Sequence, residues 1–341
     1  MNPNYFSYSP PSVFITGGTG TLGVALTKRA LGLGYKVIVY SRDEAKQAAL
    51  KQAFPGSCEI ETIIGDVRDF EKLKSSICIH NPEVIIHAAA LKRIDDLELN
   101  TDECVKTNII GSENVAKACI ANGVKQCVLI STDKACSPTN TYGCSKLIAE
   151  KTFSNYNMHS DSSLFSVRYG NVACSRGSFI PLWRDLIKSS KKINVTSLEM
   201  TRFLFTVEDA VDCVISAVNN AKGGEVFIPR ISSFSIKTII DAMSEIYNTK
   251  IDYEITGLRP GEKIHEDMIS ETELQLAFNS NSLCDMLYIV PRYCLLQKNK
   301  EVPHDVLVSN KYNGFAINSK DCQGDTESAI KIIKKGLGLE E

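Results

Sequence analysis

The stretch SVFITGGTGTLG, residues 12–23, carries the strongest fold signal in the chain. An apolar, β-branched run is followed directly by Gly17, Gly20 and Gly23, and then by a stretch with helical periodicity. Such glycines allow a tight turn, close approach of the backbone to a diphosphate and close packing of helix on strand, while the helix N-terminus attracts the anion. The stretch predicts a strand–turn–helix unit that binds a dinucleotide, with a simple tight turn as the alternative.

Similar apolar runs continue through the first half of the chain and alternate with amphipathic helical stretches. The predicted strands are residues 12–16, 36–40, 60–66, 83–90, 126–132 and 164–170, with a further strand at 224–230. Continuous apolar strands separated by helices indicate a parallel sheet covered on both faces. We therefore predict an α/β fold of the Rossmann type, a doubly wound parallel sheet with a small C-terminal substrate lobe. Ligands of such sheets bind beyond the carboxyl ends of the strands.

The strand–helix alternation also predicts the domain organisation. Residues 1–11 are expected to form a loose N-terminal extension, and residues 12–173 the dinucleotide-binding domain. Residues 205–230 return to that domain and include a helix with Thr206 as N-cap and Asp209 three residues later. Pro, Gly and polar residues become more frequent after residue 173, so 174–204 and 231–341 are assigned to a substrate-binding lobe and tail.

The composition excludes several classes of partner. Of 341 residues 43% are hydrophobic, and a net charge of −2 gives no electrostatic reason to expect nucleic acid or an acidic membrane. The apolar runs are shorter than the roughly 20 residues of a membrane span, and the N-terminus lacks a signal peptide pattern. The twelve cysteines include no CxxC pair and the histidines no metal-ligand pair, which predicts free thiols, no metal site and a reducing, cytoplasmic location. His87, at a buried strand end, is interpreted as a core residue.

The end of the second predicted strand, YSRDEAKQ, bears on the choice of cofactor. An enzyme that uses NAD usually has an acidic residue here to hold the ribose hydroxyls. This chain offers Ser41 and Arg42 first, with Lys46 one turn later. A guanidinium suits a 2′-phosphate, which favours NADP. Asp43 and the alternative of a solvated charge cluster keep NAD open.

The sixteen residues STDKACSPTNTYGCSK, 131–146, contain two pairs of chemically active side chains. Tyr142 and Lys146 have the spacing YxxxK, which places both on one face of a helix. The lysine is expected to lower the pKa of the tyrosine and to hold the nicotinamide ribose, so that the phenol can deprotonate a sugar hydroxyl during hydride transfer. Asp133 and Lys134 are not needed for that oxidation and indicate a second reaction.

Several motifs in order along the chain carry a family resemblance. They are TGGTGTLG, YSRDE, GDVRD, HAAALK, KTNIIGSENV, STDKACSPTNTYGCSK, RYGNVACSRGSFIPLW, MTRFLFTVEDAV and GLRPGEKIHEDMI. Together they resemble the extended short-chain dehydrogenase/reductases, and specifically the inverting UDP-N-acetylglucosamine 4,6-dehydratases. The likeness covers residues 12 to about 295. It is far more specific than the dinucleotide fold, which hosts many chemistries.

The resemblance implies a function for each pair. It implies NADP-dependent dehydration of UDP-N-acetylglucosamine at C4/C6 with inversion at C5, which gives UDP-2-acetamido-2,6-dideoxy-β-L-arabino-hexos-4-ulose. Tyr142 is expected to deprotonate the C4 hydroxyl. Asp133 gives a proton to the departing C6 oxygen, and Lys134 takes and later returns the C5 proton. A lysine base must be partly neutral, which burial and the neighbouring Lys146 would promote. Thr132 completes the predicted catalytic set.

Asp66, at the end of the third predicted strand, is expected to accept from the adenine amino group, with an ordinary strand-end turn as the alternative. Further positions carry over from the family. The predicted cofactor contacts beyond those above are Thr19, Thr21, Leu22, Val67, Ala88, Lys92 and Val172. The predicted substrate contacts are Lys92, Asn171, Arg176, Arg202, Arg259 and Glu262. The three arginines suit phosphate oxygens, although a surface ion pair is the alternative for each. Asn108 is expected either to support the active-site backbone or to cap a helix.

Two stretches depart from the family pattern, and two other functions stay open. RIDDLELN (93–100) lacks an expected proline and is more acidic, and NGFAINSKD (313–321) lacks an expected tyrosine. The first alternative function is a nucleotide-sugar epimerase, which would not need Asp133 and Lys134. The second is a non-catalytic NADP-binding partner protein. The resemblance also suggests a homo-oligomer.

Overall fold

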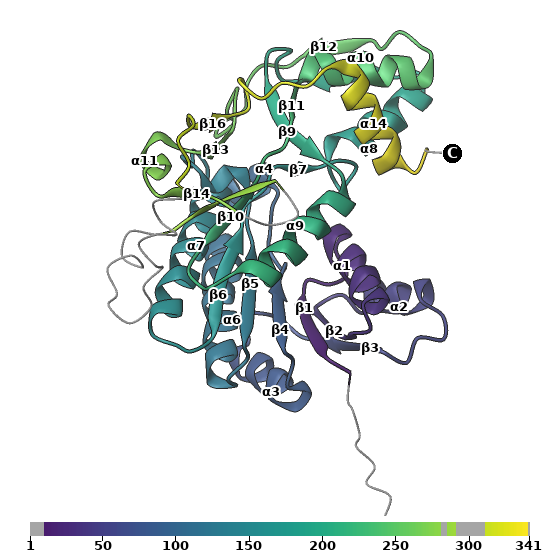
Figure 1. The fold of residues 1–341 in the computed structure, drawn as a ribbon. Coiled ribbons are helices and arrows are strands. Elements are labelled where there is room, and N and C mark those ends of the chain that lie inside the picture. Colours follow the sequence, from purple (N-terminus) through teal and green to yellow (C-terminus); the bar gives the residue numbers. More distant parts are fainter. Residues whose placement is uncertain (1–9, 281–284, 291–310, 340–341) are drawn as a thin grey trace, which may run out of the picture.

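The computed structural model describes residues 10–280, 285–290 and 311–339. Most of the predicted N-terminal extension, and residues 291–310 of the predicted tail, lie outside the described residues. In the described part, a large α/β body carries a smaller lobe beyond the carboxyl ends of the parallel strands of its main sheet (Figure 1).

Nine strands of the described residues form the main sheet, which confirms the predicted Rossmann-type architecture. Their order is β14-β15-β10-β6-β5-β4-β1-β2-β3. The strands from β3 to β10 are parallel, and their bounds are β1 (Ser12–Thr16), β2 (Lys36–Ser41), β3 (Ile60–Ile64), β4 (Val84–His87), β5 (Gln126–Ile130), β6 (Ser163–Val167) and β10 (Val226–Pro229). The order 3-2-1-4-5-6 places β1 and β4 side by side at the switch point, where ligands of this fold bind.

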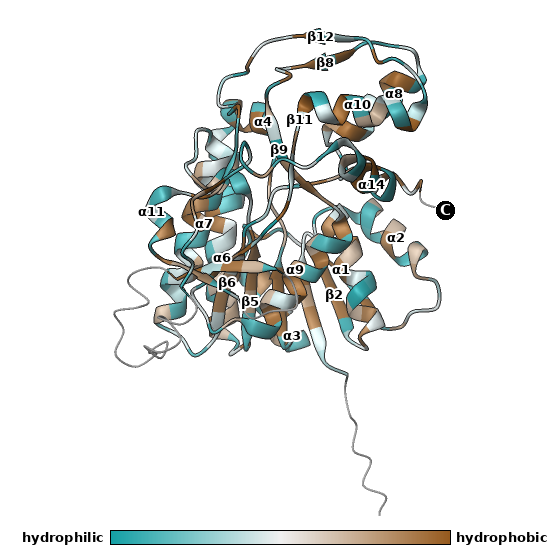
Figure 2. Cartoon of the chain, turned by 45° about the horizontal axis from the view of Figure 1, so that its top comes forward, coloured by the Kyte–Doolittle hydropathy of each residue, from teal (hydrophilic) through white to brown (hydrophobic). Residues whose placement is uncertain are grey.

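Helices cover both faces of this sheet, and each face has its own apolar core. One core includes residues of β1, β2, α1 (Thr21–Gly32), α2 (Glu44–Ala53) and α9 (Val207–Asn220). The other lies under α3 (Phe70–His80), α6 (Gly111–Ala121) and α7 (Thr141–Met158). The strands between these layers are the most apolar part of the body (Figure 2). Thr206 and Asp209 form the predicted capping box of α9.

The smaller lobe is built around a third apolar core. Its helices are α8 (Phe179–Lys188), α10 (Ile236–Tyr247) and α14 (Thr326–Leu337), which pack through residues such as Trp183, Met243 and Ile333. Its short sheets are β11 (Ser233–Ser235) with β9 (Thr201–Phe205) and β7 (Asn171–Val172), β12 (Tyr253–Ile255) with β8 (Ile193–Val195), and β13 (Asp267–Ile269) with β16 (Ile317–Asn318). The remaining elements are α4 (Ile94–Leu99), α5 (Thr101–Cys104), the π-helix η1 (Val105–Ile110), the 3₁₀ turn η2 (Asp133–Ala135) and α11 (Glu271–Leu274).

The boundary between body and lobe differs from the predicted one in one respect. β14 (Ala277–Asn279) and β15 (Met286–Ile289) fall within the segment assigned to the lobe, yet they pair in antiparallel fashion at the edge of the main sheet. Aromatic packing accompanies this pairing, since the Tyr288 ring lies 5.9 Å from Phe227 of β10 and 5.5 Å from Phe278. Such cross-strand contacts join residues that no local pattern connects.

His87 is a core residue, as interpreted from the sequence. It is fully buried, and its ring nitrogens share hydrogen bonds with the Thr16 and Ser112 hydroxyls at 2.7 and 2.9 Å. Burial, reinforced by the charge of Lys146, lowers the pKa of His87 to about 3. The neutral ring therefore ties β1 and β4 to α6.

Candidate active site

A cavity of about 1300 Å³ opens at the carboxyl ends of the strands, between the body and the smaller lobe. Nearly all of the predicted site residues line it. They are Gly17, Thr19, Gly20, Thr21, Leu22, Gly23, Ser41, Arg42, Lys46, Asp66, Val67, Ala88, Lys92, Thr132, Lys134, Tyr142, Lys146, Asn171, Val172, Arg202, Arg259 and Glu262. Two predicted residues do not line it: Asp133, which is fully buried, and Arg176, which is exposed.

The glycine-rich turn is close-packed and leaves a helix N-terminus open. Gly17 has φ +69°, and a Cβ there would lie 2.7 Å from the backbone of Ala89. A Cβ at Gly23 would lie 2.4 Å from Gly18, so the turn and α1 tolerate no side chain at either position. Helix α1 begins at Thr21 with no acidic residue in its first turn and no side-chain cap. Its free N–H groups therefore suit a diphosphate.

The charged groups after β2 and β3 lie at one end of the cavity. Asp43 accepts a hydrogen bond from the backbone N–H of Lys46 and pairs with its ammonium, so this acid caps α2. Arg42 lies 3.5 Å from the Asp66 carboxylate, which is also held at 2.7 Å by Arg68. Arg42 is 52% exposed. The Asp43 carboxylate, which could have held the ribose hydroxyls, is thus already engaged with Lys46. The Arg42 guanidinium, in contrast, is accessible.

Asn108 fixes the segment that crosses the middle of the cavity. Its buried amide donates to the Leu91 carbonyl at 2.9 Å and to Ser145 Oγ at 3.0 Å, and its oxygen accepts from the Leu91 N–H at 2.8 Å. It lies in the π-helix η1, a local widening that often marks a functional position. Of the two roles predicted for Asn108, the structure shows support of the active-site backbone.

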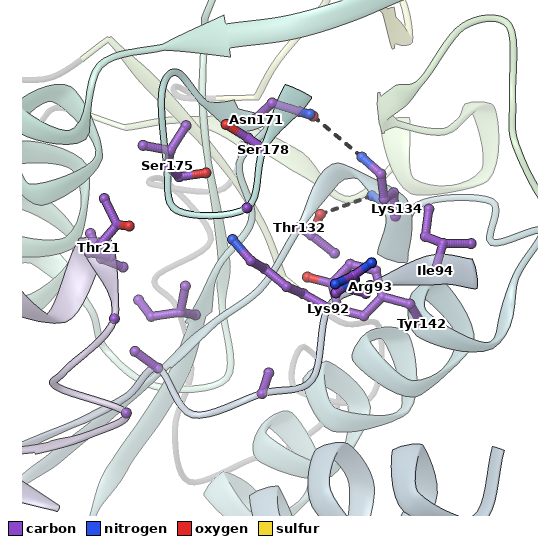
Figure 3. A pocket seen from close by; sticks show the side chains of 18 of the residues that line it. Thr21, Lys92, Arg93, Ile94, Thr132, Lys134, Tyr142, Asn171, Ser175 and Ser178 are labelled. Atoms are coloured by element: carbon purple, nitrogen blue, oxygen red, sulfur yellow. Dashed lines mark hydrogen bonds between the residues drawn. The ribbon is translucent and has the colours of Figure 1, made fainter. Parts of the chain in front are cut away.

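The predicted catalytic residues come together at the end of β5 and the start of α7. Thr132 Oγ1 donates to Asp133 Oδ1 at 2.9 Å, and Lys134 Nζ donates to the same oxygen at 3.1 Å. Nζ also reaches Asn171 Oδ1 at 3.4 Å, and the side chains of Lys134, Thr132, Asn171 and Tyr142 converge in Figure 3. The spacing YxxxK places Tyr142 and Lys146 on adjacent turns of α7, and both line the cavity.

The electrostatics of the YxxxK pair differ from the prediction. Burial raises the pKa of Tyr142 to about 12, against the opposing charge of Lys134 and a hydrogen bond with Thr132. The cation that favours the phenolate is therefore Lys134, whereas the spacing had suggested Lys146. Burial lowers the pKa of Lys146 to about 8, with Glu150 opposing the shift.

The pKa of Lys134 is not lowered, so the expectation that burial makes this lysine partly neutral was wrong. Burial alone would lower its pKa, but the carboxylates of Asp133 and Glu266 outweigh this effect, so its pKa is raised. Glu266 lies 3.5 Å from Lys134 Nζ and was missed from the sequence. Its only local signal is an acid within KIHEDMI, next to other charged residues, and nothing there connects it to residue 134.

The predicted phosphate-binding arginines are in three different states. Arg202 is buried and donates from Nη1 and Nη2 to the carbonyls of Thr201, Ile264 and Lys263. Arg259 is ion-paired to Asp95 and Glu262, each at 2.7 Å. Arg176 lies outside the lining, but its charge contributes, after burial, to the lowered pKa of Lys92. The sugar diphosphate role of all three stays a prediction.

The far end of the cavity is apolar and aromatic, which the sequence prediction did not include. Phe179 and Trp183 of α8 lie edge to face, with ring centroids 4.8 Å apart. Further lining residues here are Pro181, Leu182, Met200 and Ile236. The spacing of Phe179 and Trp183, four residues apart on one helix face, was the available signal.

The described residues contain neither a metal-binding group nor a membrane-spanning helix. No group of three or more His, Cys, Asp or Glu side chains within 10–280, 285–290 and 311–339 is arranged to hold a metal ion. None of the helices in these ranges has the length and apolarity to cross a membrane.

Comparisons with known proteins agree with this geometry. Residues 13–286 match the family described as "Polysaccharide biosynthesis protein". The chain is 43% identical over 278 residues to the UDP-N-acetylglucosamine 4,6-dehydratase (inverting) of Campylobacter jejuni, covering 80% of this chain and 81% of that protein. It is 36% identical over 274 residues to a UDP-glucose 4-epimerase of Rickettsia rickettsii, covering 78% and 80%. The crystal structure of Pen from Bacillus thuringiensis superimposes with a TM-score of 0.86 at 33% identity, covering 98% of this chain and 100% of that one.

Proposed function

The chain belongs to the polysaccharide biosynthesis family of extended short-chain dehydrogenase/reductases, among the inverting UDP-N-acetylglucosamine 4,6-dehydratases, and we propose that it catalyses the reaction named for those relatives. The substrate is UDP-N-acetylglucosamine, and the product is UDP-2-acetamido-2,6-dideoxy-β-L-arabino-hexos-4-ulose. The observation that carries the proposal is that Lys134 and Tyr142 line one cavity beside the glycine-rich turn, while the buried Asp133 accepts a hydrogen bond from Lys134 Nζ.

The residues around the turn fit a nicotinamide dinucleotide. The open N-terminus of α1 suits the diphosphate, and Lys146 suits the nicotinamide ribose. We favour NADP over NAD because Arg42 is accessible and Asp43 is engaged with Lys46. When bound, the cofactor would accept hydride from C4 of the sugar and return it to C6.

Tyr142 serves the first step. Its phenolate takes the proton of the C4 hydroxyl, and the ammonium of Lys134 stabilises that phenolate. Thr132 shares a hydrogen bond with Tyr142 and donates to Asp133, so the proton gained by Tyr142 has a path toward Asp133. That path matters because each turnover leaves Tyr142 with one more proton and Asp133 with one fewer.

Asp133 and Lys134 serve the second step. The C4 ketone acidifies the C5 proton, which a neutral Lys134 can then remove while a protonated Asp133 gives its proton to the departing C6 hydroxyl. The two side chains form an ion pair with Nζ and Oδ1 3.1 Å apart. Moving one proton along that contact converts the ion pair into the neutral base and neutral acid that elimination requires.

The aromatic end of the cavity is suited to the uracil of a UDP-sugar. Phe179 and Trp183 provide ring faces and edges, and Asn194 and Thr196 line the same region with polar groups. Lys92 also lines the cavity, and its ammonium form suits the sugar diphosphate.

The decisive experiment is incubation of the purified protein with UDP-N-acetylglucosamine and catalytic NADP, followed by mass spectrometry. We expect loss of one water without net consumption of cofactor, and no loss of water in the Tyr142→Phe variant. A product of unchanged mass with C4 epimerised would instead identify the kind of epimerase that the Rickettsia relative's name suggests, and one with C5 epimerised a different nucleotide-sugar epimerase. Absence of any turnover would favour a non-catalytic role.

Isotopes then test the stereochemistry. With C4-deuterated substrate in ordinary water we expect deuterium at C6 of the product, and in deuterated water we expect solvent deuterium at C5. Proton couplings at C5 should show the inverted configuration. Retained configuration would place the protein outside the inverting branch, and loss of the C4 deuterium to solvent would contradict internal hydride return.

A further inference from the structure

Glu266 lies immediately before β13, and its carboxylate is buried against the catalytic lysine. Its side chain is 4% exposed, and Oε1 lies 3.5 Å from Lys134 Nζ. The backbone around it is fixed, because its N–H donates to Ser319 Oγ and its carbonyl accepts from the Ser319 N–H, both at 2.8 Å. The carboxylate is therefore held in place by the sheet of β13 and β16.

The other cations near Glu266 are farther away and have other partners. Arg202 Nε and Lys263 Nζ each lie 3.9 Å from the carboxylate. Arg202 donates to backbone carbonyls, and Lys263 donates to the Cys136 carbonyl at 2.9 Å. Oε2 of Glu266 has no hydrogen-bond partner among the described residues. A buried carboxylate that is only partly satisfied destabilises the fold, which favours a functional reason for its presence.

Three acceptors surround the Lys134 ammonium. They are Asp133 on η2, Asn171 on β7 and Glu266 before β13. Asp133 and Asn171 accept hydrogen bonds from Nζ, and Glu266 forms a longer ion pair with it, so these three groups together fix Nζ in position. Two other groups face it electrostatically, Arg202 on β9 and Tyr142 on α7.

We propose that Glu266 is a positioning residue for the dehydration, whose buried carboxylate holds the Nζ atom of Lys134 beside Asp133 and governs the protonation of this acid–base pair. The catalytic role of Glu266 rests on the proposed function. Its influence on Lys134 rests on the 3.5 Å contact between Oε1 and Nζ. Glu266 does not line the cavity and therefore acts through Lys134, which lies nearer to it than another lining cation, Arg202, at 3.9 Å.

The proposal predicts the direction in which the pKa of Lys134 moves when the charge of Glu266 is removed. Burial raises the pKa of Glu266, and the charge of Lys134 opposes that shift. In its ionised form Glu266 stabilises the ammonium form of Lys134, whose pKa is raised, so the resting enzyme keeps this lysine protonated and in contact with Asp133. Removal of that charge makes Lys134 lose its proton at lower pH. A carboxylate within about 4 Å shifts a neighbouring pKa by about 1–3 units, which sets the expected size of the effect.

The first test needs no substrate. Protein labelled with ¹³C at lysine Cε is titrated by NMR, and the resonance that is missing from Lys134→Met is assigned to Lys134. In Glu266→Gln the titration midpoint of Lys134 should fall by at least about one pH unit. In Glu266→Asp, which keeps the charge, it should stay near the wild-type value. Asp267→Asn is the matched control, because that carboxylate faces Lys263 and Asn318 instead of Lys134.

The second test is the pH profile of dehydration. We expect Glu266→Gln to move the acidic limb of kcat to lower pH and to leave KM within about twofold, while Glu266→Asp lowers kcat without moving the limb. An unmoved Lys134 midpoint in Glu266→Gln would overturn the inference even if dehydration occurs. A moved midpoint in a protein that never dehydrates UDP-N-acetylglucosamine would uphold the coupling of Glu266 to Lys134 and overturn the proposed function instead.

Discussion

Two regions at the cavity, the cofactor end near Arg42 and the region around Lys134 that we call the catalytic end, have the same kinds of charged group in opposite environments. At the cofactor end, Arg42 is 52% exposed and its contact with Asp66 is 3.5 Å long. At the catalytic end, the side chain of Lys134 is 13% exposed and those of Asp133 and Glu266 are 1% and 4% exposed. Water screens the first set, whereas the second set interacts at low effective dielectric.

This difference separates two uses of charge. Exposed charges add modest binding energy and discriminate between ligands, because water competes for each contact. Buried charges determine one another's protonation, because no water is present to stabilise an isolated ion. The comparison predicts that substitutions at the catalytic end change proton transfer, while substitutions at the cofactor end change affinity.

The largest effect is expected when the buried end loses its cation. Lys134→Met should lower the rate of water loss by at least about 10²-fold, the low end for a general base. Substrate should still bind, and reduced cofactor should form slowly, because Tyr142 remains but loses the Lys134 charge that favours its phenolate. Absorbance of the reduced nicotinamide measures this. Lys263→Met removes a neighbouring cation outside the cavity lining and serves as control. Near-normal dehydration by Lys134→Met would show that the buried charge of Lys134 does not control proton transfer.

The next effect tests the exposed end. Arg42→Ala should weaken NADP binding by about 1.5–3 kcal/mol, the range for hydrogen bonds to charged groups, and leave NAD nearly unchanged. Calorimetric titration with each dinucleotide measures this. Arg29→Ala, whose side chain pairs with Asp212 outside the lining, should change neither affinity. Equal losses for both cofactors would show that Arg42 is structural.

A third prediction follows from burial of Lys146. Its folded-state pKa, about 8, is lower than that of an unfolded lysine, so the unfolded state binds more protons above pH 8 and stability rises with pH there. Relative to Lys146→Met, the wild-type protein should gain roughly 1–2 kcal/mol of unfolding free energy between about pH 7.5 and pH 9.5. Urea unfolding of both proteins at the two pH values measures it. Parallel pH dependences would show that Lys146 is not desolvated.

The smallest effect is expected at the mouth of the cavity. Asp95 and Arg259 form an ion pair in which each side chain is 55% exposed. Asp95→Asn should change KM for the UDP-sugar by less than about fivefold, since exposed pairs contribute about 0.2–1 kcal/mol. The change should shrink further in high salt. A larger, salt-independent change would mean that this pair becomes buried when substrate binds.

Much of the fold could be predicted from local patterns. The apolar runs that became β1 to β6 and β10 were located to within a few residues, and the capping box of α9 was predicted from Thr206 and Asp209. The predicted strands 60–66, 83–90, 126–132 and 164–170 extended past the observed carboxyl ends, because residues there line the cavity instead of continuing the sheet. β14 and β15 were missed as sheet members because their partner is β10, far along the chain.

The sequence by itself determined which chemical groups this protein has: a glycine-rich turn after the first strand, Asp133 beside Lys134, and Tyr142 one helical turn before Lys146. These signals are local, since a turn, a dipeptide and a helical spacing each depend only on neighbours in the chain. The tertiary structure alone decided their electrostatic states. Glu266 reaches Lys134 only because β13 packs against the turn η2. Because the contact is buried, the charge of Glu266 raises the pKa of Lys134.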